Sequence, residues 1–381
     1  MHIDRFIGFF TSLRLTVVCL GLGFVLVFAG TLAQVNLGVY QAQSDFFRSF
    51  FVYWPLKGTK IPVFPGGYLI GSLLLLNLIA AHIKRFKLSK KKVGLFLIHI
   101  GLIVLLLGQL LTDMLSVESG VHLRVGESKN YSEERRRCEL AVKDVSDADS
   151  DKVAVVGEDA LAGRKEVRLP EMPLTVRVRA YYANSDISLT NDLTGSYREA
   201  AATRGSGIGL WWKAQPRSAS TDVSELQSGL VEIFSQGKSL GTWLVSEALN
   251  PQTFTFDNRI YQIALRAKRD YQPFSLELLK FNHAIYKGTD IPKDFSSRVR
   301  LRRPDTGEDR EVLIYMNNPL RYGGKTFYQA SYDPDDRGTV LQVVRNPGWL
   351  TPYFSCALMA LGMLIQFLSH LVPFLKARLL T

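Results

Sequence analysis

The fold class of this chain is indicated by the uncharged apolar stretch Val93-Gly94-Leu95-Phe96-Leu97-Ile98-His99-Ile100-Gly101-Leu102. The same stretch contains one histidine, His99. Burying an imidazole in hydrocarbon is costly unless the ring has a partner, so a histidine at such a place is by default a candidate functional residue. This stretch alone leaves two interpretations of His99 open. The ring either binds a ligand or forms a hydrogen bond to a neighbouring helix.

The same run is one of four that approach the length of a membrane span. A helix needs about 20 mainly apolar residues to cross the hydrocarbon core. The four runs are Leu15–Gln34, Tyr68–Ile83, Val93–Thr112 and Leu350–Leu371. We predict four transmembrane helices. We expect the first to be retained rather than removed as a signal peptide, because no convincing small-residue cleavage site follows it.

Basic residues beside the runs predict the orientation. The segment Lys84–Lys92 holds six Lys or Arg and no acidic residue, and such loops stay in the cytoplasm. Both termini are then cytoplasmic, and Ser116–Pro347 is extracytoplasmic. We interpret the net charge of +11 as charge that orients helices and meets anionic lipid of the bilayer, not as a nucleic-acid site. The expected location is the cytoplasmic (inner) membrane.

The long segment between the third and fourth runs has the two-residue period of β-strands. Alternating residues occur in Val176–Tyr182, Tyr261–Arg266, Val299–Arg302, Glu311–Tyr315 and Thr326–Tyr332, which is typical of half-buried strands. We predict a β-rich domain, either a sandwich or an open barrel-like sheet. The acidic, weakly patterned stretch Val142–Glu166 is interpreted as an excursion from it.

The predicted fold class is an α+β membrane protein, with four transmembrane helices and a large β-rich extracytoplasmic domain inserted between helices three and four. We expect an N-terminal membrane region with three helices over residues 1–115. The β-rich domain covers 116–347, and the last helix with a short cytoplasmic tail covers 348–381.

Cysteines and short motifs exclude several chemistries. The chain has three cysteines, Cys19, Cys138 and Cys356, and no C-x-x-C, so neither a thioredoxin-like site nor haem attachment through that motif is available. The signatures of phosphate-binding loops, zinc proteases and serine hydrolases are absent too. Cys138 follows Arg135-Arg136-Arg137, which can favour a thiolate, but we prefer an ordinary strand cysteine. We expect the pair Trp211-Trp212 to be exposed or close to the membrane.

Several motifs together resemble a known family. They are Ser12–Val18, Gly30–Gln34 and Tyr315–Tyr332, the last of which continues to Asn346-Pro347-Gly348 and the final run. Their order and the four-span pattern are similar to the ResB-like (CcsB) family of system II cytochrome c biogenesis proteins over nearly the whole chain. The resemblance implies a membrane subunit that works with a ResC/CcsA-type haem-handling protein. The two together export haem and support its covalent attachment to apocytochrome c. It also implies a non-catalytic or co-catalytic subunit, and no catalytic residue is assigned.

The resemblance gives His99 a role, because a histidine in the third span of that family is regarded as a haem ligand. A neutral imidazole nitrogen can hold haem iron. The expected cofactor is haem b, bound transiently and shared with the partner. Gly94, Gly101 and Gly108 recur every seven residues on the side away from His99, and such a stripe predicts close helix packing.

The other histidines are weaker candidates. His82 and His370 end the second and fourth runs, where the helix dipole favours an imidazole, and we prefer that structural interpretation for both. His122 and His283 have no flanking ligand pattern. Their roles, like that of Cys138, stay open.

The stretch Asn317–Tyr332 is interpreted as a structural hairpin. Asn317-Asn318-Pro319 leaves one strand, Gly323 and Gly324 supply the turn, and the returning strand carries Tyr328 and Gln329. Paired glycines give the backbone freedom that tight hairpin turns require.

Two other classes of function remain as alternatives. One is a membrane-anchored extracytoplasmic binding or sensor module with no haem role, for which the cytoplasmic tails are too short to form an output domain. The other is a membrane redox subunit, which needs stacked histidine pairs that one well-buried histidine does not supply.

Overall fold

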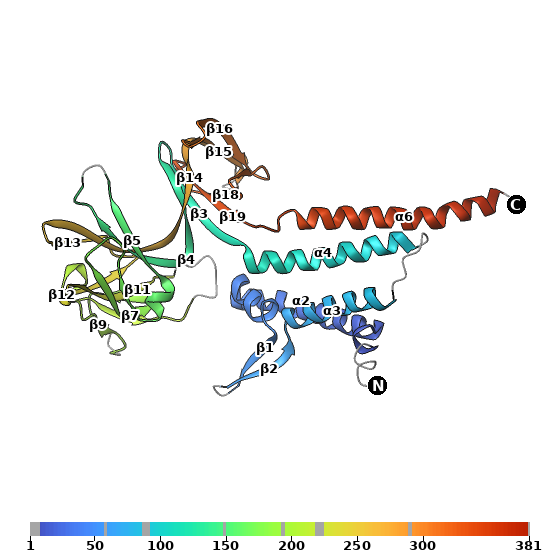
Figure 1. The fold of residues 1–381 in the computed structure, drawn as a ribbon, viewed down its shortest axis with the longest axis horizontal. Helices are drawn as coiled ribbons and strands as arrows, with labels where there is room; N and C mark the ends of the chain where they lie inside the picture. Colours follow the sequence, from blue (N-terminus) through green and yellow to red (C-terminus); the bar gives the residue numbers. More distant parts are fainter. Residues whose placement is uncertain are drawn as a thin grey trace. The chain divides into compact units, whose positions relative to one another are not determined.

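A computed structural model describes residues 8–56, 59–85, 92–147, 150–191, 195–217, 225–288 and 292–379 (Figure 1). The described residues up to Val117 and from Asn346 onward form one compact unit, and those from Glu118 to Arg345 form a second. Residues 86–91, which make up most of the basic segment Lys84–Lys92, lie outside the described residues.

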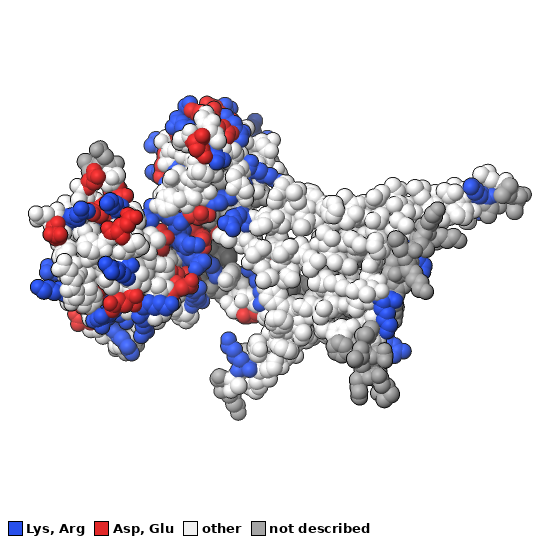
Figure 2. Space-filling model, in the orientation of Figure 1, with Lys and Arg blue, Asp and Glu red and all other residues white. Residues whose placement is uncertain are grey.

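Four helices of the first unit are long and apolar enough to cross a membrane. They are α2 (Leu13–Ala42), α3 (Gly67–Arg85), α4 (Val93–Leu115) and α6 (Thr351–Leu379). Each overlaps one predicted run, but α2 and α6 continue past the predicted ends at Gln34 and Leu371. In Figure 2 charged side chains are sparse along the helices and dense on the β-rich unit.

Helices α4 and α6 pack closely through the predicted glycine stripe, and they lie side by side in Figure 1. Gly94, Gly101 and Gly108 are all buried. A Cβ added to Gly101 would lie 2.5 Å from Met359 Cγ, and one added to Gly94 would lie 2.6 Å from the Gln366 backbone nitrogen. The small residues therefore set the distance between the two helices.

Helices α2 and α3 are tied together by a buried amide. The Oγ1 of Thr16 donates a hydrogen bond of 2.6 Å to Asn77 Oδ1. The Nδ2 of Asn77 donates to the carbonyl oxygens of Phe10 and Ser12, at 2.7 and 3.1 Å. Polar contacts of this kind join helices where no hydrophobic difference between protein and lipid drives association.

A π-helix and a hairpin separate α2 from α3. The π-helix is η1 (Gln43–Phe47), and the antiparallel hairpin is β1 (Phe51–Leu56) with β2 (Thr59–Pro65). This hairpin was not predicted from the sequence. It contains Pro62 and Pro65, and proline is uncommon within strands. The backbone packs closely at the base of the hairpin, since a Cβ on Gly66 would lie 2.2 Å from the Ser49 carbonyl oxygen.

The second unit is built from antiparallel strands, as the alternating sequence predicts. The larger sheet has ten strands in the path β16-β15-β14-β4-β3-β19-β18-β17, with β13 on β14 and β5 on β4. Its strands are β3 (Val117–Arg124), β4 (Ser128–Asp144), β5 (Lys152–Gly157), β13 (Gln252–Phe256), β14 (Arg259–Ile285), β15 (Pro292–Arg303), β16 (Glu308–Tyr315), β17 (Leu320–Tyr322), β18 (Lys325–Tyr332) and β19 (Gly338–Arg345).

Two smaller sheets complete the unit, in the orders β12-β11-β7-β6 and β8-β10-β9. Their strands are β6 (Glu166–Arg168), β7 (Thr175–Tyr182), β8 (Ser185–Ser188), β9 (Arg198–Glu199), β10 (Trp211–Ala214), β11 (Ser228–Ser235) and β12 (Lys238–Ser246). A short helix, α5 (Glu158–Ala162), and a 3₁₀ turn, η3 (Gly205–Gly207), lie between strands.

The long strand β14 passes through two separate hydrophobic cores. In its first half Tyr261, Ile263 and Leu265 face a core shared with the four-stranded sheet. In its second half Phe274, Leu276 and Leu278 face a core formed with β15–β19. The register shift between Tyr271 and Leu276 contains Pro273, which cannot donate a ladder hydrogen bond.

One expectation about this unit was wrong, and the exposure expected for the tryptophan pair was wrong as well. The stretch Val142–Glu166 is not an excursion, because it contains β5 and α5 and contributes Ala154, Val156 and Leu161 to the first core. Trp212 is buried in strand β10 and its ring lies 4.5 Å from that of Tyr182. Strand β10 has only four residues. That is too short for the sequence to show the alternation that would predict a buried Trp212.

Candidate functional site

His99 lies in the first half of α4, and its ring is oriented by the helix itself. Its Nδ1 is 2.9 Å from the carbonyl oxygen of Leu95, one turn earlier. A carbonyl oxygen only accepts, so Nδ1 carries the proton, and the lone pair of the neutral ring lies on Nε2. A neutral imidazole with that tautomer is the form that binds iron.

The structure brings a second histidine beside His99. The ring of His82, from the last turn of α3, has its centroid 5.5 Å from that of His99, with 58° between the ring planes. Phe96, also from α4, has its ring centroid 5.1 Å from that of His82. Both histidines are half-buried. Helix α4 therefore presents its glycines to α6 and His99 to α3.

The pairing of His82 with His99 was not predicted from the sequence. His82 does lie in the last turn of α3, as the dipole interpretation requires, but that interpretation says nothing about His99. The available signal was the short connection, because consecutive antiparallel helices place residues at similar distances from their loop side by side. Among the described residues no group of three or more His, Cys, Asp or Glu could hold a metal ion.

His370 is not part of this pair, and its predicted position at a helix end was wrong. Helix α6 continues to Leu379, so the dipole argument does not apply to a residue in its interior. The side chain is exposed, and Gln366 Nε2 donates to its Nε2 at 2.9 Å.

His122 and His283 both hold the loop that joins β18 to β19. The Nε2 of His122 is 2.9 Å from both carboxylate oxygens of Asp333. His283 Nδ1 is 3.0 Å from Asp336 Oδ1, and its ring packs 4.3 Å from that of Tyr332. The hydrogen bond from His122 holds the pKa of Asp333 below its usual value. The geometry gives both histidines a structural role.

Cys138 is an ordinary strand cysteine. It is fully buried in β4, and its Sγ lies 3.3 Å from the hydroxyl of Tyr181. Burial raises the pKa of the thiol to about 12. The preceding Arg137 is directed to carboxylates instead, 3.9 Å from Glu158 and 3.7 Å from Asp159.

The glycine pair forms a turn, and Gln329 after it joins neighbouring strands. Gly323 and Gly324 have φ of +58° and +73° and join β17 to β18, as expected for a tight hairpin turn. Gln329 accepts from Ser297 Oγ at 2.6 Å and donates to Thr339 Oγ1 at 2.7 Å, which links β15, β18 and β19. Tyr328 is exposed beside it. These contacts describe a structural motif.

Two comparisons with known proteins bear on the family. The model of the ResB-like family matches residues 237–339, which include β13 to β18 and the Gly323-Gly324 turn. Protein NrfI of Wolinella succinogenes is 27% identical over 321 residues, and the match covers 78% of this chain and 29% of NrfI. The chain thus spans less than a third of the length of NrfI. Together the two matches confirm the resemblance seen in the sequence and relate this chain to the ResB-like family.

Proposed function

We propose that this chain is a membrane subunit for cytochrome c biogenesis. With a ResC/CcsA-type partner it exports haem and supports the attachment of that haem to apocytochrome c. The chain itself is a non-catalytic or co-catalytic subunit of a haem-exporting cytochrome c synthase complex. The observation that carries the proposal is the orientation of His99, whose Nδ1 is bonded to Leu95 at 2.9 Å, in a chain that resembles the ResB-like family.

Haem is the cargo in this proposal, and the residues present fit it. Nε2 of His99 has the lone pair that haem iron accepts, and α4 is apolar around it. His82 adds a second imidazole close by. We assign His99 as the axial ligand and expect the other axial ligand to come from the partner. His82 stays a positioning residue.

The proposed topology makes the site accessible from the side where haem is made. Both termini and the Lys84–Lys92 segment are cytoplasmic, and the β-rich unit is extracytoplasmic, in the cytoplasmic membrane. His99 then lies about 9 Å beyond the start of α4, in the cytoplasmic half of the bilayer. Haem synthesised inside the cell reaches it early in the transfer.

The first experiment changes His99 in the complex with its partner. The purified wild-type complex should contain haem b, measured as the pyridine haemochrome per protein. His99→Ala should lose most of that haem, and cytochrome c maturation should fall with it. His99→Gly should behave alike, and added imidazole should restore part of both, because it fills the vacated coordination site.

The matched control is His370→Ala, which removes an exposed imidazole from the same membrane unit and should leave haem content unchanged. Yield and monodispersity of each complex show that it is assembled. A stable His99→Ala complex with wild-type haem content would refute the assignment. Loss of haem in His82→Ala, with retention in His99→Ala, would move the ligand to His82.

A further inference from the structure

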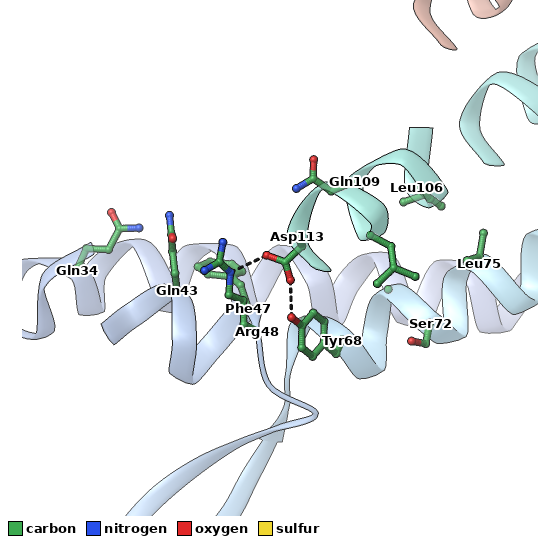
Figure 3. A pocket seen from close by; sticks show the side chains of 13 residues that line it. Gln34, Gln43, Phe47, Arg48, Tyr68, Ser72, Leu75, Leu106, Gln109 and Asp113 are labelled. Carbon is green, nitrogen blue, oxygen red and sulfur yellow. Dashed lines mark hydrogen bonds and ion pairs between the residues drawn. The ribbon is translucent and has the colours of Figure 1, made fainter. Parts of the chain in front are cut away.

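A cavity of about 420 Å³ lies at the ends of the helices opposite to the two histidines (Figure 3). Asp113 is fourteen positions after His99 in α4, so the two places are about 20 Å apart. The cavity is lined by Gln34, Gln43, Phe47, Arg48, Gly67, Tyr68, Gly71, Ser72, Leu75, Leu106, Gln109, Leu110 and Asp113. Its size is within the usual range for small-molecule sites.

The charged side chains of the cavity neutralise each other. Arg48 Nε lies 2.7 Å from Asp113 Oδ1, and the hydroxyl of Tyr68 donates to Oδ2 of the same carboxylate. Among the described residues that line the cavity, Arg48 and Asp113 are the only charged ones. The cavity therefore offers no unpaired charge to a phosphate or a carboxylate, and it suits a neutral ligand.

Three carboxamides surround this ion pair without a bond of their own. Within the described ranges, the side chains of Gln34, Gln43 and Gln109 form no hydrogen bond, and Figure 3 shows them around Arg48, Asp113 and Tyr68. Gln34 is half-buried, and Gln43 and Gln109 are exposed. Each amide has donors and an acceptor that a ligand with hydrogen-bonding oxygens can use.

The shape of the wall also indicates a ligand site. Gln43 and Phe47 come from η1, and π-helical turns occur frequently at functional sites. Gly71 leaves the α3 side open, because a Cβ built there meets no atom within 4 Å. Gln109 and Leu110 are exposed, so the cavity opens sideways at the level of the membrane.

We propose that this cavity binds the head group of a membrane quinone or quinol. A quinone ring is flat and neutral, carries opposed oxygens and has an apolar tail that can leave through the open side. An amide N–H donates to a quinone carbonyl, and an amide oxygen accepts from a quinol hydroxyl, so the glutamines serve both forms. Phe47 and Tyr68 supply aromatic faces for the ring. This site does not depend on the haem proposal.

The test uses the purified full chain in phosphatidylcholine nanodiscs, titrated with a short-tailed isoprenoid benzoquinone by calorimetry. The wild type should bind it saturably. Gly71→Leu fills the cavity and should raise the dissociation constant at least about tenfold. Gln109→Leu removes hydrogen bonds and should raise it up to about tenfold. The control is Gly21→Leu, because Gly21 lies outside the cavity and its Cβ also meets no atom within 4 Å.

Three results of the titration would contradict the proposed quinone site. They are no saturable binding by the wild type, unchanged affinity in both cavity variants, or an equal loss of affinity in Gly21→Leu. A fourth comes from mass spectrometry of the purified protein. A phospholipid that stays bound at one per chain, and that excess quinone does not displace, would assign the cavity to lipid instead. If Gly71→Leu fails to fold, Gln109→Leu decides.

Discussion

Three arginines precede Cys138, yet the thiol is buried against Tyr181, and its pKa is raised to about 12. Far less thiolate is present at pH 8 than in a cysteine of ordinary pKa, by roughly a thousandfold. We expect no labelling of Cys138 by iodoacetamide at that pH in the folded protein, and rapid labelling after unfolding in detergent. Mass spectrometry of the tryptic peptide measures both.

The control for this labelling is Thr306→Cys, which places a cysteine in the exposed turn between β15 and β16 and should react in the folded state. Labelling of Cys138 at the rate of that control would contradict the buried environment. Residue identity alone could not decide this point, because sequence shows the nearby arginines but not the carboxylates that bind Arg137.

The two histidines show the same limit at the residue scale. His99 stands out in the sequence because its neighbours are apolar. Its tautomer follows from the contact of Nδ1 with Leu95 within α4. Its neighbour His82 depends on how α3 and α4 pair, and periodicity does not give that pairing. The cavity glutamines could not be predicted for a similar reason, since Gln34 and Gln109 line one cavity only when the helices that carry them are assembled.

At the scale of elements, the glycine stripe of α4 was predictable because its seven-residue spacing keeps one helix face small. The partner helix was not, and the structure identifies it as α6. Gly101→Leu should push α6 away, because a Cβ there would already lie 2.5 Å from Met359 Cγ and 3.0 Å from the Ser355 carbonyl oxygen. Overpacking of this kind lowers the free energy of unfolding by about 1–3 kcal/mol. Thermal unfolding in detergent, followed by circular dichroism, measures the loss.

Gly21→Leu in α2 is the matched control, since it adds the same side chain where no atom lies within 4 Å. This variant should unfold at the same temperature as the wild type. Equal stability of the two variants would show that α4 and α6 do not pack as described.

Strands were predictable where they are long and half-buried, as in β7, β14 and β18. The hairpin β1–β2 and the short strand β10 gave no clear period, and the acidic composition near β5 concealed the buried Ala154 and Val156. Their burial depends on the opposite sheet rather than on local pattern.

For the whole molecule, alternation predicted a β-rich insertion but not that a single strand crosses two cores. Between those cores β14 and β4 are joined by opposite charges in register. Arg266 lies 2.8 Å from Glu139, Lys268 2.5 Å from Glu134, and Arg269 3.0 Å from Glu133. Opposite charges on neighbouring strands favour one register where no apolar face does so. The sequence alone does not show which charges face each other, because that depends on how the two strands pair.

Topology is the property of the whole chain on which the haem proposal rests. We expect the exposed turn at Thr306 to face outward and Lys376 in α6 to face the cytoplasm. Single cysteines are placed at these positions after Cys19, Cys138 and Cys356 are replaced by Ser. A membrane-impermeant maleimide should then label Thr306→Cys in intact spheroplasts. It should label Lys376→Cys only after permeabilisation, because the reagent cannot cross the bilayer.

The reverse pattern would place His99 in the outer half of the membrane, where it would receive haem only late in transfer. Labelling of both positions before permeabilisation would contradict a path in which α6 crosses the bilayer.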